Sequence, residues 1–183
     1  MSPLDSKPEQ VGIAHHTSRK RGTWSDKHGT PEHVIALVRQ MFGRIDDDLA
    51  SSHEFNKTVG ARWYYSIESP CPEMIQTDIP SVIYCNPPGP SKNVIWFFDV
   101  WQEATRRPNA GAFLIYNIDH WRMLEPKRPL WALMFRKRLA FLGIPHRKRS
   151  DGANFASVLV TTKKPPKGFG HIFRWEPKKE KRR

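Results

Sequence analysis

The residues best suited to chemistry lie at 81–89, where a short apolar run ends in Asn86-Pro87-Pro88-Gly89. The run before Asn86 is β-branched and aromatic, which is typical of a buried strand in a parallel sheet. Two successive prolines fix φ and remove two backbone donors, so the carbonyl oxygens of this turn point outward without donors beside them. Such acceptors suit a ligand that carries an amino group, and open α/β sheets bind ligands at the carboxyl ends of their strands.

A second pattern marks the start of a helix that would have to position this turn. Thr30 is expected to be the N-cap, Pro31 the first helical residue, and Glu32 an acid in the positive first turn. Apolar residues then recur at helical spacing as far as Met41, and Gly43 closes the helix. One face of this helix should therefore pack on a sheet.

The rest of the pattern alternates short strands with helices. The expected strands are residues 44–46, 63–65, 82–84, 111–117, 138–142 and 154–161, and residues 171–175 could add an edge strand. The expected helices after the first are residues 53–59 and 94–105. This order predicts an α/β fold with a compact, mostly parallel central sheet flanked by helices. Trp121 and Trp131 are expected in its core.

Composition limits the class of protein. The chain has 183 residues, a formal net charge of +12 and only two cysteines. One domain of this size can bury a proper core, and its charge favours a polyanionic partner, nucleic acid before a membrane surface. No Cys/His cluster has metal-ligand spacing, so we expect no metal site. No apolar run is long enough to span a membrane and no signal peptide is evident, so a reducing cytoplasmic location is expected.

The ends of the chain differ from its middle in composition. Residues 1–23 mix Pro, Ser, His, Lys and Arg without periodicity and are expected to form a flexible basic arm. Residues 176–183 are expected to be a basic tail. The folded domain is therefore expected over residues 24–175.

Several segments together resemble a known family. These are residues 29–34, residues 45–59, the Tyr84–Gly89 turn, and the late pair 138–141 and 152–158, in that order along the chain. The pattern is similar to that of the phage-type DNA N6-adenine methyltransferases, which use S-adenosylmethionine, and it covers about residues 24–161. The resemblance implies a Rossmann-like methyltransferase fold and a methyl acceptor in DNA, in a phage or prophage setting where methylation protects against restriction.

The chemistry gives independent reasons for the residue types at the turn. The exocyclic amine of adenine is a poor nucleophile because its lone pair is delocalised into the ring. The side-chain oxygen of Asn86 and the carbonyl of Pro87, held by Pro88, can accept both amine hydrogens and direct the lone pair at a sulfonium methyl. We therefore expect Asn86, Pro87 and Pro88 to be the catalytic residues, without a strong base.

Cofactor contacts follow from the resemblance and from electrostatics. In related enzymes the Thr-Pro segment lies against the methionine end of the cofactor, which implies that role for Thr30 and Pro31. Asp46 or Asp48, at a strand's carboxyl end, could pair with the cofactor's amino group or bind its ribose hydroxyls. Taken alone, the Thr-Pro segment is a well-capped helix and the acidic run is a solvated turn or a metal-attracting loop.

DNA contacts are expected from the basic residues near the predicted strand at 138–142. Arg138 belongs to the resembling motif, and Arg147, Lys148 and Arg149 lie in a loop suited to phosphate contacts or, equally, in a charged exposed hairpin. The partner is expected to be duplex DNA with the target adenine flipped out. Gly89 stands where the family often has an aromatic that stacks on that base, so stacking is expected from Trp96 or Phe97.

Two other interpretations remain open. Leu49-Ala50-Ser51-Ser52 stands where the family has a glycine-rich turn, so a catalytically degenerate relative that binds nucleic acid or a host protein is an alternative. The same fold acting on RNA is a third, because the turn reads an amine and not a sugar.

Overall fold

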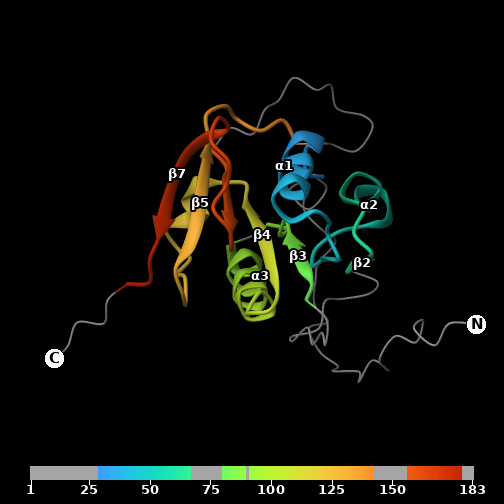
Figure 1. Cartoon of the computed structure of the whole chain (residues 1–183), viewed down its shortest axis with the longest axis horizontal. Coiled ribbons are helices and arrows are strands. Elements are labelled where there is room, and N and C mark those ends of the chain that lie inside the picture. Colours follow the sequence, from blue (N-terminus) through green and yellow to red (C-terminus); the bar gives the residue numbers. More distant parts are fainter. Residues whose placement is uncertain (1–28, 67–79, 90, 142–155, 179–183) are drawn as a thin grey trace, which may run out of the picture.

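The protein is described here from a computed structural model, which defines residues 29–66, 80–89, 91–141 and 156–178. Within these residues the chain forms one seven-stranded sheet in the order β2-β1-β3-β4-β6-β5-β7 (Figure 1). The strands are β1 (Asp47–Asp48), β2 (Trp63–Tyr64), β3 (Val82–Cys85), β4 (Ala110–Ile115), β5 (Leu130–Phe135), β6 (Val158–Thr161) and β7 (Gly170–Trp175). The helices are α1 (Glu32–Phe42), α2 (His53–Val59), α3 (Ser91–Ala104) and α4 (Ile118–Trp121).

The expected α/β class is confirmed, but the sheet is parallel only in its first half. β2, β1, β3 and β4 pair in parallel, whereas β4 with β6, β6 with β5, and β5 with β7 pair antiparallel. The expectation of a mostly parallel sheet was therefore wrong for the carboxyl-terminal half. The reason is that β6 inserts between β4 and β5 in the opposite direction, which a strand pattern along the sequence does not reveal.

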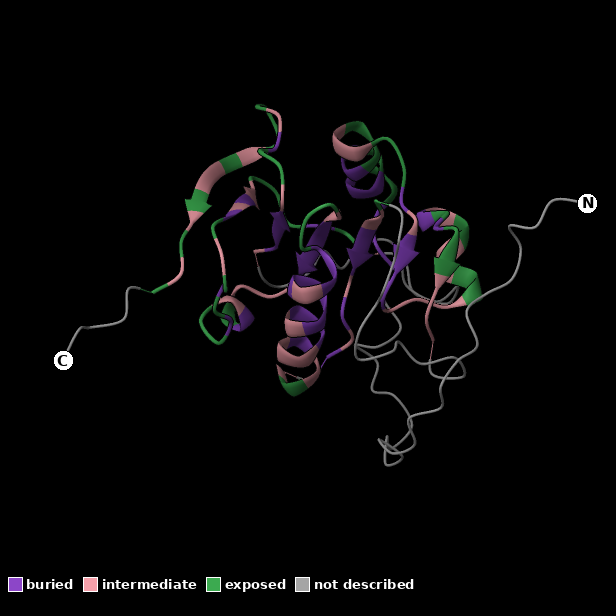
Figure 2. Cartoon of the chain, turned by 60° about the horizontal axis from the view of Figure 1, so that its bottom comes forward, coloured by how far each residue is buried: buried purple, intermediate pink, exposed green. Residues whose placement is uncertain are grey.

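Helices cover the two faces of the parallel half. α1 and α3 lie on opposite sides of the strands, and β7 and β2 mark the two edges (Figure 1). Each face has its own hydrophobic core. In the first core, α1 packs against the face that carries Tyr84 and Ala112. The second packs α3 against the face that carries Ile83 and Phe113, and Trp101 lies at its centre. Buried residues are concentrated in the inner strands and the helix faces turned toward them, whereas β7 is half-exposed (Figure 2).

The first helix begins one residue later than expected. Pro31, and not Thr30, is the N-cap residue, and no side chain caps the helix. The carbonyl of Pro31 accepts from the amides of Val34 at 3.0 Å and Ile35 at 3.3 Å. Thr30 does not cap because its hydroxyl lies 2.7 Å from the phenol oxygen of Tyr84. Gly43 ends the helix as expected, with φ at 86°.

Strand bounds show the largest differences from the sequence-based expectation. No strand forms over residues 138–141, and the strand that was missed is β5 at Leu130–Phe135. Its continuous apolar run has no period that separates strand from helix. The strand ends at Phe135 and the three basic residues that follow it are exposed, although Leu139 still packs into the core. Residue 142 lies outside the described part of the chain.

The other elements are shifted by a few residues. The strand expected at 44–46 is β1 at Asp47–Asp48, and the strand expected at 154–161 is β6, which begins at Val158. α3 begins at Ser91, three residues before its first expected residue, and the edge strand at 171–175 is confirmed as β7. α4 was not expected.

Gly111 lets β3 and β4 approach closely, and this gives a test of the fold. A Cβ at Gly111 would lie 2.0 Å from the carbonyl oxygen of Ile83, a backbone atom that cannot give way without breaking the pairing. We expect Gly111→Ala to lower the free energy of unfolding by about 3 kcal/mol or more. Chemical denaturation followed by circular dichroism measures this loss.

The matched control is Gly168→Ala, where φ is +106° but no atom lies within 4 Å of the added Cβ. This variant should lose only about 1–2 kcal/mol, the cost of a side chain in the left-handed region. Equal losses in the two variants would contradict the close approach of β3 and β4.

Candidate active site

The candidate site lies where the order of the parallel strands reverses. After β1 the chain passes through α2 to β2 on one side, and then returns to β3 on the other side of β1. α2 contacts α1, whereas α3, which follows β3, packs on the opposite face. The segments that leave the carboxyl ends of β1 and β3 therefore separate, and such switch points are where open α/β sheets bind ligands.

The proline turn, residues 86–89, lies at the carboxyl end of β3. Asn86 and Pro88 are half-buried, whereas Pro87 and Gly89 are buried, so the turn is neither sealed in the core nor fully in solvent. The strand before it is anchored, since the Ile83 carbonyl accepts from the indole of Trp101 at 3.1 Å and the Tyr84 carbonyl from the amide of Leu49 at 3.0 Å. The amide side chain of Asn93, in the first turn of α3, donates to the Gly89 carbonyl at 3.4 Å. These contacts fix both ends of the turn.

Asp48 stands at the neighbouring carboxyl end, that of β1, and is 1% exposed. Its carboxylate accepts from the Ala50 amide at 3.3 Å. Burial raises the pKa of Asp48 to about 7, against the opposing effect of hydrogen bonds from the Ala50 amide and the Ser51 side chain. Among the described residues no basic side chain forms an ion pair with it. A buried acid of this kind at a strand end is a candidate for a functional residue.

The two preceding acids differ from Asp48 in position. Asp46 lies before β1 and not at its carboxyl end, and its carboxylate is already used by the Arg44 guanidinium at 2.8 Å and the Val82 amide at 2.8 Å. Of the two acids expected to bind the cofactor, only Asp48 therefore stands at the strand end. The pKa of Asp47 is raised to about 6, mainly by burial and secondly by the charge of Asp46, with Arg62 opposing.

Thr30 is joined to the sheet by its hydrogen bond to Tyr84, and both side chains are buried. Burial raises the pKa of the Tyr84 phenol well above its ordinary value, so this group stays protonated. Tyr84 pairs with Asp48 in the register of β1 and β3, which places the two side chains on one face. The structure thus gathers Thr30, Tyr84 and Asp48 beside the switch point. Tyr84 was not expected as a site residue, because within a buried strand its hydroxyl gives no sequence signal.

The expected DNA-binding residues are placed only in part. Arg138 is exposed in the segment that follows β5, and Arg147, Lys148 and Arg149 lie outside the described residues. Of the two expected stacking residues, Phe97 is buried in the core and Trp96 is half-buried, edge-on to Phe97 at 4.7 Å. Only Trp96 thus has exposed surface to offer a base.

His120 lies near the carboxyl end of β4, and the sequence did not single it out as a site residue. It lies on α4, directly after β4, and is 8% exposed. Its Nδ1 has no hydrogen-bond partner within the described residues, and its ring packs edge-on to Tyr116 at 5.0 Å. Burial lowers the pKa of its imidazole, with Asp119 opposing. Its only sequence signal was its place just after an apolar strand.

Comparisons with protein-family models, with curated proteins and with solved structures give no match to this chain. Within the described residues, no group of three or more His, Cys, Asp or Glu side chains could hold a metal ion. No helix found there is long and apolar enough to cross a membrane.

The raised pKa of Asp48 predicts a pH-dependent stability. Its pKa is higher in the folded chain than the ordinary 3.8, so the native state holds this proton more tightly than the unfolded state does. The free energy of unfolding should fall as pH rises from about 4 to about 7. Asp48→Asn should remove much of that fall and be more stable than the parent at pH 8, by up to ~4 kcal/mol. Urea unfolding at pH 5 and pH 8 measures both effects.

The control is Glu54→Gln, which removes a fully exposed acid on α2. Because the Asp47 carboxyl is also buried, some fall with pH should persist in Asp48→Asn. Parallel stability curves for Asp48→Asn and the parent would contradict the assigned protonation of Asp48.

Proposed function

We propose that this chain transfers a methyl group from S-adenosylmethionine to the N6 amine of adenine in DNA, on a Rossmann-like methyltransferase fold. The observation that carries the proposal is the meeting of two strand ends at the switch point. The proline turn of β3 and the buried acid of β1 are neighbours there, since Asp48 and Tyr84 are paired residues. An acceptor for an amine and an acceptor for a cation thus adjoin each other.

The turn is suited to hold an amine. Asn86 can offer its side-chain oxygen and Pro87 its carbonyl, and neither proline has an amide hydrogen to compete. Accepting both amine hydrogens would favour the pyramidal nitrogen of the transition state over the planar nitrogen of the free base. Trp101 and Leu49 anchor the carbonyls of Ile83 and Tyr84 in the strand before the turn. A turn held in this way before substrate binds would lower the cost of orientation.

Asp48 fits a cofactor that carries an ammonium group. Its carboxyl is buried and meets only donors that are uncharged, so an added cation would find a partner there and would lower the pKa of the acid. Thr30 and Pro31 adjoin the same face through the bond to Tyr84, in keeping with a role beside the methionine end. When bound, the cofactor supplies an electrophilic methyl on a sulfonium.

Proton loss after methyl transfer needs no strong base. The nitrogen becomes cationic as the new bond forms, and its proton is then acidic enough to leave to Asn86, Pro87 or water. A DNA substrate also fits the formal net charge of +12. A flipped adenine would still need a stacking surface, and the half-buried Trp96 on α3 is the described residue that can contribute one.

Asn86→Ala tests the proposal. Incubation of unmethylated DNA with methyl-labelled S-adenosylmethionine, followed by nucleoside mass spectrometry, should show N6-methyladenine with the parent protein. Asn86→Ala should lower the rate by about 10²–10³-fold, because an oriented acceptor at the reacting nitrogen is lost. Its affinity for the cofactor, measured by calorimetry, should change less than threefold.

The matched control is Gln40→Ala, which removes an exposed amide from α1 and should retain the parental rate. Full activity in Asn86→Ala, or a label on a base other than adenine, would refute the assigned role of the turn. A parent protein that binds DNA but gives no heat with S-adenosylmethionine would identify the chain as the degenerate, nucleic-acid-binding alternative.

A further inference from the structure

The antiparallel half of the sheet has a feature that the site does not use. β6 and β7 both pair with β5 and run in the same direction on its two sides. The chain must therefore return over a face of β5 between Thr161 and Gly170. In α/β sheets such a return is usually made by a helix. Here residues 162–169 make it without one, as a crossover segment that contains Lys163, Lys164 and Lys167.

Aromatic rings contact two lysines of this segment and an arginine of β7. The Nζ atom of Lys164 lies 5.1 Å from the ring centroid of Trp131, and the guanidinium carbon of Arg174 lies 5.0 Å from the same centroid. The Nζ atom of Lys163 lies 5.3 Å from the ring of Phe42, at the end of α1. Trp131, which was expected in the core, is only half-buried. Cations and rings thus alternate from α1 to the edge strand β7.

Positive charge is concentrated on this half of the protein. Residues 130–141 and 156–178 contain eight Lys or Arg and one acid, Glu176. All other described residues together contain ten Lys or Arg and nine acids. The charge that favours a polyanionic partner therefore lies, within the described residues, almost wholly in the segments that follow β5, β6 and β7, with Arg174 on β7 itself.

These cations are largely unneutralised. Lys163, Lys164 and Lys167 are exposed, and none of them forms an ion pair within the described residues. Two of the eight meet an acid: the Nε of Arg174 lies 3.3 Å from a carboxylate oxygen of Glu176, and the Nζ of Lys178 lies 3.4 Å from one of Glu125. Like charges held this close without counter-charges are costly, and a polyanion would relieve that cost.

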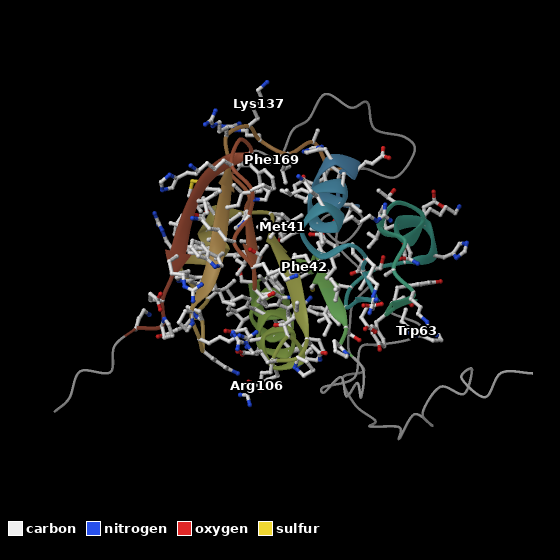
Figure 3. All side chains as sticks on the ribbon, viewed as in Figure 1. Met41, Phe42, Trp63, Arg106, Lys137 and Phe169 are labelled. Carbon is white, nitrogen blue, oxygen red and sulfur yellow. The ribbon has the colours of Figure 1, made fainter. Side chains whose placement is uncertain are left out.

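The basic residues continue to the edge that carries the candidate active site. β5 ends at Phe135 beside the start of β6, at the same edge as the carboxyl end of β4. Arg136 and Lys137 follow there, and the Arg136 amide donates to the Phe169 carbonyl at 3.4 Å. Figure 3 shows Lys137 and Phe169 side by side at this end, far from Arg106 at the opposite end of the molecule. From Trp131 to Arg136 the strand spans about 17 Å.

We propose that the crossover segment, together with Arg136 and Lys137 after β5 and Arg174 on β7, binds the phosphate backbone of duplex DNA, as a track that leads from the candidate active site outward. The span of about 17 Å corresponds to roughly five base pairs of duplex. Among the described residues of this half, Phe169 is the one large apolar side chain that is exposed, so the face suits a hydrated phosphate backbone better than an anionic membrane. The choice of DNA rests on the proposed function. The contacts involve phosphates only, so the track supplies affinity without sequence preference.

The test is the salt dependence of DNA binding. The triple variant is Lys163→Gln, Lys164→Gln, Lys167→Gln in the full-length chain, and its ligand is a 20-base-pair duplex. A plot of log Kd against log salt concentration should have a slope lower than the parent's by about 3, since each lost phosphate contact removes about one unit. Fluorescence anisotropy from 50 to 300 mM NaCl measures this slope. The thermal midpoint should stay near the parent's, because all three side chains are exposed.

The matched control is Lys57→Gln, Arg106→Gln, Arg107→Gln, which removes three exposed positive charges from α2 and the end of α3. Its salt slope should stay within about 1 of the parental value. Equal loss of slope in both variants would show that net charge alone acts, and an unchanged slope in the crossover variant would also overturn the proposal. Tighter binding of duplex RNA than duplex DNA, with the same dependence on the three lysines, would refute DNA as the occupant.

The outcome is separable from that of the proposed function. A parent protein that binds duplex DNA through these lysines but gives no heat with S-adenosylmethionine would support the track and contradict methyl transfer. A parent protein that binds the cofactor, with a crossover variant that binds DNA as the parent does, would support the cofactor site and contradict the track.

Discussion

The parallel pairing of β1 with β3 is the constraint on which the candidate site depends. β1 has only two residues, yet hydrogen bonds extend the pairing at both ends, from the Asp46 amide to the Val82 carbonyl at 2.8 Å and from the Leu49 amide to the Tyr84 carbonyl at 3.0 Å. The Asp46 carboxylate adds a bond to the Val82 amide. A shift of one residue would exchange the two faces of the strand and remove Asp48 from the side of Tyr84.

This register places polar groups where a core would normally be apolar. Thr30, Tyr84 and Asp48 are each at most 3% exposed, and the acid has no basic partner within the described residues. Such an arrangement lowers the stability of the free protein, because burial disfavours the ionised carboxyl. A bound cation would offset that cost. The buried carboxyl of Asp48 therefore both forms the candidate site and lowers the stability of the free protein, as is common for binding sites.

Local signals predicted the elements that position the site. The Pro-Glu start and Gly43 end of α1, the apolar β3 strand and its proline turn all depend on side-chain type over a few residues, and each was placed within about a residue. Which of the three consecutive acids stands at the strand end was not predictable, because β1 is too short to show a period. The bond between Thr30 and Tyr84 joins residues 54 positions apart, so no local pattern reports it.

Non-local pairing explains the remaining errors. β5 and β7 pair through contacts that only the folded sheet defines, and β6 reverses the strand direction between β4 and β5. The basic residues of the crossover segment were visible in the sequence as charge alone. Their alignment with Trp131 and Arg174 required the register of β5 with β7, in which those two residues are paired.

The most direct test of the switch-point site is amide hydrogen exchange with and without saturating S-adenosylmethionine. Cofactor binding at the switch point should slow exchange in two segments that are far apart in the sequence, residues 48–52 after β1 and residues 84–89 at the proline turn, and should leave β5–β7 unchanged. Slower exchange in neither segment, or only at β5–β7, would contradict a cofactor site between the ends of β1 and β3.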